Sequence, residues 1–371
     1  MKKNLIKKLA LVVVLCLITV PQFSQPPHKI RVLSYYAGRP ELLDSFKIEN
    51  MTHLIFCFGR LTGNRFSVRS PRDTATIQKM VSLKSRNPEL KVLLSLGGWG
   101  GCKTCSDVFA TKQGRKEFVQ SLKEFYDYFK VDGLDLDWEY PAIKGYPGHK
   151  FVPEDKKNFT KLVNEIRKLG HDHELSFAAG NSERFLDSAI QWKQVMKKVD
   201  YVNLMTYDQS GPGSPISAHH TNLYSTPDQP RSADFMVKSL LNMGIPSEKI
   251  IVGGAFYGKI FENVDSINNG LARPGKFKNT LIYRNVATQL PADSGWVYHW
   301  DEAASAPYLY NKVKRQFFTY DDERSIEMKT KYVIDNNLGG IMYWQLAGDL
   351  YKNGLLDVID RVKKNYTGGN R

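Results

Sequence analysis

The sequence predicts an α/β protein built as a (β/α)8 TIM barrel with a small inserted α+β lobe. Short β-branched and apolar runs alternate with longer amphipathic segments from Ile30 onward, as expected for βα units that form a parallel sheet. Eight such units account for nearly the whole chain, which favours a closed barrel. An open doubly wound sheet is the alternative, but no glycine-rich phosphate-binding turn follows the first strand.

Each unit supplies one expected strand, and most units supply one expected helix. The strands are expected at residues 31–36, 53–58, 91–96, 133–139, 174–179, 201–207, 250–256 and 340–344. The helices are expected at residues 74–85, 112–129, 156–169, 186–198, 232–243, 322–336 and 355–365. In a barrel of this kind the active site forms at the carboxyl ends of the strands.

One connection departs from this alternation of strands and helices. Residues 257–318 are too many for a plain loop, and they contain strand-like pieces rich in aromatics at 280–283 and 295–300. We therefore expect an α+β lobe after the seventh strand, standing as a wall beside the barrel mouth.

Residues 1–25 have the pattern of a secretory signal peptide, with four lysines followed by an apolar run at 9–20. That run is too short for an ordinary membrane span, and no later stretch approaches the required length. We therefore expect residues 26–371 to be a soluble catalytic unit, either secreted or periplasmic. Cys16 leaves a lipid anchor as an alternative, although Leu15 is bulky where such a processing site needs a small residue.

The chain carries a formal net charge of +14, of which about +10 remains when residues 1–25 are removed. Its basic residues are dispersed beside acids, and no arginine-rich run is interleaved with aromatics. This distribution is typical of a solvated surface, so nucleic acid is not an expected partner. We expect a monomer that needs no cofactor.

The cysteines and a histidine pair raise the question of a metal site. Cys102 and Cys105 form a C-x-x-C pair, for which a local disulfide is favoured over free thiols, because a zinc site would need a second pair. Cys57 lies in an apolar run and is expected to be a buried thiol. His219 and His220 lack a third placed ligand, so we expect them to face solvent and expect no metal.

The run from Asp132 to Glu139 reads Asp-Gly-Leu-Asp-Leu-Asp-Trp-Glu. Because successive strand residues point to opposite sides, Asp135, Asp137 and Glu139 share one face, and the apolar residues share the other. A solvated surface or a calcium-binding loop fits this alternation less well. Three acids so close together resist joint ionisation, which predicts a general acid with a tuned pKa. Asp132 does not share the face of these three acids in the alternation, and it is expected to support the start of the strand.

Aromatic residues dominate the strand ends that should meet at the barrel mouth. Flat aromatic faces suit sugar rings, and interspersed carboxylates and hydroxyls suit sugar hydroxyls and amides. The strand-end residues are Tyr35, Tyr36, Phe58, Ser95, Glu139, Met205, Tyr207, Asp208, Tyr257 and Trp344.

Four motifs in register resemble those of the family 18 glycoside hydrolases, the chitinases. Residues 132–139 resemble the D-x-x-D-x-D-x-E signature, and residues 95–98 resemble S-x-G-G on the third strand. Residues 205–208 resemble M-x-Y-D on the sixth strand, and Trp344 is similar to the tryptophan of the eighth. The lobe is similar to the insertion domain of the deep-cleft subfamily.

The resemblance implies a substrate-assisted mechanism on chitin or chito-oligosaccharides. The three acids lie side by side and cannot flank the anomeric carbon from opposite faces, as a protein nucleophile would require. The resemblance supplies the substrate's 2-acetamido oxygen as nucleophile, with retained stereochemistry. In that scheme Glu139 is the general acid, Asp137 stabilises the acetamido N–H, Asp135 shares a proton with Asp137, and Tyr207 donates to the acetamido oxygen.

The remaining residues are carried over from the same resemblance. Asp208 should bind the sugar at the cleavage site, Trp344 should form its floor, and Trp99 should stack on the leaving-group side. Ser95 should support Asp135 rather than touch substrate. The other expected lining residues are Met205, Tyr35, Phe58 and Tyr257.

Two other functions remain open on the same fold. A chitinase-like lectin usually lacks the terminal acid of the signature, whereas this chain keeps Glu139. An endo-β-N-acetylglucosaminidase acting on N-linked glycans uses the same acid pair, but the inserted lobe favours a linear polymer. The barrel and lobe use up the mature chain, so we expect no separate carbohydrate-binding module.

Overall fold

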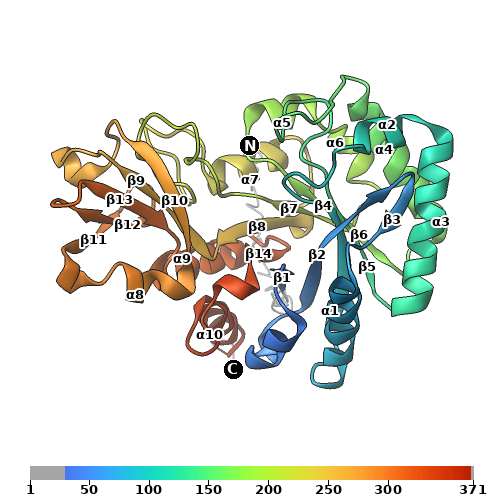
Figure 1. Ribbon diagram of the computed structural model, residues 1–371, viewed down its shortest axis with the longest axis horizontal. Helices are drawn as coiled ribbons and strands as arrows, with labels where there is room; N and C mark the ends of the chain where they lie inside the picture. Colours follow the sequence, from blue (N-terminus) through green and yellow to red (C-terminus); the bar gives the residue numbers. More distant parts are fainter. Residues whose placement is uncertain (1–29, 369–371) are drawn as a thin grey trace, which may run out of the picture.

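A computed structural model describes residues 30–368 and places a closed parallel barrel at the centre of the molecule (Figure 1). Its sheet runs in the order β1-β14-β8-β7-β6-β5-β4-β2, and pairing of β1 with β2 closes the ring. The prediction of a (β/α)8 barrel is confirmed. The barrel strands are β1 (Arg31–Tyr36), β2 (His53–Thr62), β4 (Lys91–Gly97), β5 (Gly133–Asp137), β6 (Glu174–Ala179), β7 (Tyr201–Leu204), β8 (Ile250–Ala255) and β14 (Gly340–Trp344).

Three strand ends differ from the sequence prediction by two residues or more. β2 is longer than expected and forms a hairpin with β3 (Arg65–Ser67). β5 and β7 are shorter, ending at Asp137 and Leu204. After β7 the Thr206 hydroxyl bonds both the amide and the carbonyl of Gly253, in place of a backbone ladder. In β5 and β7 the alternation in the sequence therefore continues beyond the last residue that pairs with a neighbouring strand.

The helices surround the barrel, and most agree with the expected segments to within a few residues. They are α1 (Pro71–Ser82), α2 (Cys105–Ala110), α3 (Lys112–Phe129), α4 (Asp155–Ile166), α5 (Glu183–Ser188), α6 (Trp192–Val195), α7 (Ala233–Asn242), α9 (Glu323–Asp335) and α10 (Leu355–Gly368). No helix within residues 30–368 is long and apolar enough to cross a membrane. The predicted signal peptide and the alternative anchor at Cys16 lie outside the described residues.

The single helix expected at residues 186–198 is wrong, because α5 and α6 are separate. The Trp192 indole N–H donates to the carbonyl of Leu186 at 2.8 Å. In a continuous helix that carbonyl would accept from Ile190, so the indole takes the place of the next helical hydrogen bond.

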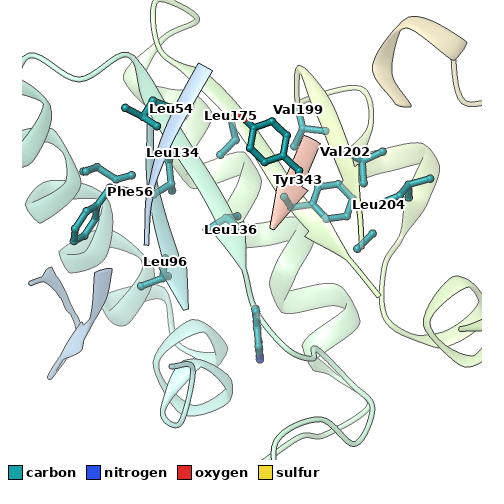
Figure 2. Close-up of a cluster of buried hydrophobic side chains, with 14 of the residues drawn as sticks. Leu54, Phe56, Leu96, Leu134, Leu136, Leu175, Val199, Val202, Leu204 and Tyr343 are labelled. Carbon is teal, nitrogen blue, oxygen red and sulfur yellow. The ribbon is translucent and has the colours of Figure 1, made fainter. Parts of the chain in front are cut away.

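The core has two layers on either side of the barrel wall. Figure 2 shows the outer layer, where Leu54, Leu134, Leu136 and Leu175 from neighbouring strands pack beneath the helices. The inner layer fills the barrel with Leu33, Ile55, Leu93, Tyr201, Ile251 and Met342. Along β5 the leucines thus face outward, which leaves the acidic residues between them facing the interior.

The residues between β8 and α9 in the sequence form a second, antiparallel sheet, which lies to the left of the barrel in Figure 1. It has the order β10-β9-β13-β12-β11, with the short helix α8 (Val286–Gln289) between β10 and β11. The sheet extends two residues beyond the expected boundary at 318. Its strands are β9 (Tyr257–Glu262), β10 (Lys276–Ile282), β11 (Trp296–Asp301), β12 (Ala306–Asn311) and β13 (Gln316–Tyr320).

A fully buried ion pair fastens the end of this lobe to the barrel. Asp321, the residue after β13, lies 2.7 Å from Lys329 Nζ on α9, and neither side chain is exposed. Asp321 also accepts hydrogen bonds from the Thr221 hydroxyl and from the Ala255 amide of β8, both at 2.9 Å. Because each charge is paired and hydrogen-bonded, the pair holds the lobe in a defined position on the barrel.

Candidate active site

A cleft of about 890 Å³ opens at the carboxyl ends of the barrel strands. One wall is formed by barrel residues, and the lobe contributes the other through Thr280 and Ile282 of β10. Of the predicted site residues, those that line the cleft are Tyr35, Phe58, Trp99, Asp137, Glu139, Met205, Tyr207, Asp208, Tyr257 and Trp344.

Asp135 lies beneath the cleft and has no exposed surface. Its carboxylate accepts hydrogen bonds from Tyr35 (3.0 Å), Ser95 (2.9 Å), Ser176 (2.7 Å) and Asn203 (3.1 Å). Burial nevertheless raises its pKa above the ordinary aspartate value, and these hydrogen bonds oppose that shift. Ser95 therefore has the supporting position that the sequence predicts, and Tyr35 holds Asp135 as well as lining the cleft.

Asp137 stands one step higher on the same face of β5, and its environment favours a bound proton. Its Oδ1 is buried and has no hydrogen-bond partner among the described residues. Burial, followed by the charges of Glu139 and Asp135, raises its pKa well above the ordinary value. A neutral carboxyl group here can donate to a substrate or to a neighbouring carboxylate.

Glu139 lies past the end of β5, where it reaches the cleft with 8% of its surface exposed. Burial raises its pKa to about 7, a hydrogen bond from Tyr140 opposes the shift, and the charge of Asp208 adds to it. At neutral pH a large fraction of this carboxyl group keeps its proton. Such a pKa suits a group that must give up a proton and take it back near pH 7.

Asp208 lines the same cleft as Glu139 and is held from the lobe side. Its Oδ1 accepts hydrogen bonds from the Tyr257 hydroxyl and from Lys259 Nζ, each at 2.6 Å. Lys259, on β9 of the lobe, is only 5% exposed, so the lobe places a buried positive charge beside the barrel cleft. Asp208 also adopts a left-handed backbone conformation, with φ of 59°. This carboxylate is therefore fixed in place before any substrate arrives.

Tyr207 and Met205 follow β7 and border the same space. Burial raises the pKa of Tyr207 well above the ordinary tyrosine value, so its hydroxyl stays protonated and can donate. That hydroxyl lies 3.9 Å from the Met342 sulfur, a weak acceptor that an incoming carbonyl oxygen would outcompete.

The aromatic residues form the floor and rim of the cleft. Trp344 stacks on Phe58, with ring centroids 5.4 Å apart and planes at 14°, and is tilted against Tyr35. Trp99 stands at the rim with 58% of its surface exposed. The floor is thus braced by stacking, whereas Trp99 is open to a ligand.

Two predicted supporting features are not part of the cleft lining. Asp132 at the start of β5 accepts a hydrogen bond from the Val92 amide at 2.7 Å and pairs with Lys84, which fits a role at the strand entry. The Sγ atoms of Cys102 and Cys105 are joined in a disulfide, while Cys57 is a free, half-buried thiol.

The expectation that His219 and His220 face solvent is wrong. Both are buried: His219 Nε2 lies 3.1 Å from Asp301 of the lobe, and His220 Nε2 lies 3.2 Å from the carbonyl of Tyr257. Burial, then the charge of Lys259, holds the pKa of His220 well below its usual range. These side chains fasten the loop after β7 to the lobe. Within residues 30–368 no group of three or more side chains could hold a metal ion.

Sequence reasoning missed several residues of the cleft. Tyr140 and Lys259 could have been found, because each is close in sequence to a predicted site residue at a strand end. Gln345, which directly follows Trp344, could have been found in the same way, whereas nothing in the sequence around Arg231 marks it as a cleft residue. Arg231 donates to the Gln209 carbonyl at 3.1 Å, a contact made only by the folded loops.

Comparison with known proteins places the chain among proteins with this barrel. Residues 31–349 match the model of the glycosyl hydrolases family 18. Chitinase A1 of Niallia circulans is 33% identical over 301 residues, covering 74% of this chain and 43% of that protein. A probable chitinase 2 of Drosophila melanogaster is 30% identical, covering 86% and 71%. The chain thus spans less than half of the first relative and about 70% of the second.

Solved structures give the same result. A multi-modular, cell-surface-expressed chitinase of Paenibacillus sp. has a TM-score of 0.83 at 32% identity, with 90% of this chain and 42% of that chain covered. A family 18 N-acetylglucosaminidase of Paenibacillus barengoltzii has a TM-score of 0.81 at 31% identity, with coverage of 90% and 100%.

Proposed function

Because the chain belongs to family 18 of the glycosyl hydrolases, we propose that it is a chitinase that cleaves β-1,4 bonds between N-acetylglucosamine units. The observation that carries the proposal is the arrangement of Glu139 and Asp137. One acid with a pKa of about 7 opens to an aromatic-lined cleft, and a second, held neutral, lies directly beneath it. This arrangement suits protonation of a glycosidic oxygen above a stacked sugar ring.

The nucleophile in this proposal is the acetamido oxygen of the substrate. The remaining acid that lines the cleft, Asp208, is already engaged by Tyr257 and Lys259, and it has a sugar-binding role. Glu139 protonates the leaving oxygen while the acetamido oxygen attacks the anomeric carbon and forms an oxazolinium intermediate. Glu139 then takes a proton from the water that opens this intermediate, so the anomeric configuration is retained.

The groups around the acetamido function keep it in position. Tyr207 donates its hydroxyl proton to the acetamido oxygen, and Asp137 turns toward the acetamido N–H. Asp135 shares a proton with Asp137, since the hydrogen bonds that Asp135 accepts make it the better site for the negative charge of the pair. Trp344 supports the sugar ring from below.

The product ladder from a defined N-acetylglucosamine hexamer tests this function. We expect shorter N-acetylated oligomers whose new reducing ends are first released as the β-anomer, which NMR of the early products measures. Products released first as the α-anomer, or no cleavage of the hexamer, would contradict the proposal. A high-mannose glycoprotein assayed in parallel tests the alternative endo-β-N-acetylglucosaminidase, which the lobe wall of Thr280 and Ile282 disfavours because it deepens the cleft for a linear chain.

The hydrolysis rate should fall as the pH rises through about 7. The reason is that Glu139 must carry a proton to act as the acid, and burial raises its pKa to about 7. We expect the alkaline limb of the kcat/KM profile on the hexamer to lie near that value. A limb near the ordinary glutamate pKa would show that Glu139 is not the proton donor.

A further inference from the structure

The residues that follow β7 at the cleft are held by side chains rather than by a strand ladder. Pairing of β7 with β6 and with β8 ends at Leu204. On the β8 side the Thr206 hydroxyl bonds the neighbouring backbone. On the β6 side the contacts come from Asn181, whose Nδ2 donates to the carbonyl of Met205 at 2.8 Å and to the carbonyl of Tyr207.

These two contacts depend on the amide nitrogen of Asn181. Both partners are carbonyl oxygens, so the nitrogen of the side chain must face them, and its two protons serve both. Within residues 30–368 the backbone of Tyr207 makes no hydrogen bond to another backbone group. The contact from Asn181 is therefore the one that fixes the Tyr207 carbonyl.

Asn181 is itself held between two fixed elements. β6 ends at Ala179, and Ser182 is the N-cap of α5, where its hydroxyl accepts from the Phe185 amide at 3.2 Å. Only Gly180 lies between the strand and Asn181. A connection this short leaves the backbone of Asn181 little freedom, so its side chain is a firm support for the residues after β7.

The hydroxyl of Tyr207 lacks a strong partner that would set its direction. Within the described part of the chain its hydrogen-bond partner is the weakly accepting Met342 sulfur, at 3.9 Å. The hydroxyl therefore takes the direction that the backbone of Tyr207 gives it, and Asn181 holds that backbone. Asn181 is not among the residues that line the cleft, so it can affect a ligand only through its neighbours.

We propose that Asn181 is a positioning residue that directs the Tyr207 hydroxyl toward the acetamido oxygen of the substrate. The inference rests on the proposed function, in which Tyr207 donates to that oxygen, and it adds the residue that sets the direction of the donor. A displacement of about 1 Å in a reacting group can cost about a hundredfold in rate. Loss of the Asn181 contacts should therefore lower kcat more than it changes KM.

Asn181→Asp in the full chain tests this role, because an ionised aspartate has the same size but no proton to donate. We expect kcat on the N-acetylglucosamine hexamer to fall by about tenfold to a hundredfold, with KM changed by less than about threefold. Asn87→Asp is the matched control. Asn87 Nδ2 also donates to two carbonyls, those of Ile48 at 3.1 Å and Met51 at 3.0 Å, and it precedes the amino end of β4, away from the cleft. This control should keep the kcat of the unmodified protein, and an equal loss in both variants would overturn the inference.

A double-mutant cycle shows whether Asn181 acts through Tyr207. Tyr207→Phe removes the hydroxyl and should lower kcat by about a hundredfold. Adding Asn181→Asp to that variant should then cost less than about threefold more, because no hydroxyl is left to direct. A loss of folded protein would instead multiply the loss caused by Tyr207→Phe.

Three results would overturn the inference: losses that multiply in the double variant, an unchanged kcat in Asn181→Asp, and full activity in Tyr207→Phe. An unmodified protein that does not cleave the hexamer would instead contradict the proposed function itself. That result differs from an active protein that is insensitive to Asn181→Asp.

Discussion

Replacing Glu139 with glutamine is expected to abolish hydrolysis of N-acetylglucosamine oligomers while leaving their binding intact. Glutamine keeps the size of the side chain and its contacts with the cleft but cannot deliver a proton to the leaving oxygen. General acid catalysis is worth about 10² to 10⁴ in rate, and in the proposed mechanism Asp137 is engaged with the acetamido N–H rather than with the leaving oxygen. We expect the hexamer turnover to fall by at least about a thousandfold.

Binding and turnover must be measured on the same variant. Calorimetric titration of Glu139→Gln with the hexamer should give a dissociation constant close to the KM of the unmodified protein. Glu89→Gln is the matched control, since Glu89 is an exposed glutamate before the amino end of β4, on the far side of the barrel from the cleft. If Glu139→Gln keeps turnover within about tenfold of the unmodified protein, the assignment of the acid is lost.

The second large effect concerns the substrate. A fully deacetylated glucosamine hexamer should not be cleaved, because it lacks the acetamido oxygen that attacks the anomeric carbon. We expect no attack in its place from Asp137, Asp208 or Tyr207. The first is held neutral, the second is engaged by Tyr257, and the third keeps its proton. The measurement is mass spectrometry of the products after long incubation, with the acetylated hexamer as the positive control.

Partially acetylated oligomers make this test independent of binding. Each cut requires an acetamido group on the unit whose anomeric carbon is attacked. Every new reducing end should therefore carry an N-acetyl group, whatever the composition of the rest of the chain. New reducing ends that are glucosamine, or measurable hydrolysis of the deacetylated hexamer, would rule out substrate assistance.

The acidic face could be predicted because strand geometry is local. The period of two places Asp135, Asp137 and Glu139 on one side of β5, and the leucines between them are found facing outward in the structure. Only the strand end was misplaced, since pairing with neighbours stops at Asp137 while the alternation continues to Glu139. The barrel likewise followed from eight repeated units.

The histidine pair shows where this reasoning fails. His219 and His220 lie in a loop whose sequence looks exposed, yet the lobe covers them and takes their hydrogen bonds. The separation of α5 from α6 is a similar case. The Trp192 indole donates to the Leu186 carbonyl, and the amphipathic pattern of the sequence does not indicate that contact. Burial by a distant segment is a property of the packed chain.

The sequence by itself therefore determined the barrel and the face on which the acids lie, because both depend on short-range periodicity, and its residue identities carry the resemblance to family 18. Tertiary structure alone decided what surrounds those acids. It places Lys259 of the lobe on Asp208, buries the Oδ1 of Asp137 with no hydrogen-bond partner among residues 30–368, and sets Tyr146 beside Trp99. These contacts join segments that are far apart in sequence, and the pKa of Glu139 depends on the burial and charge that only such packing creates.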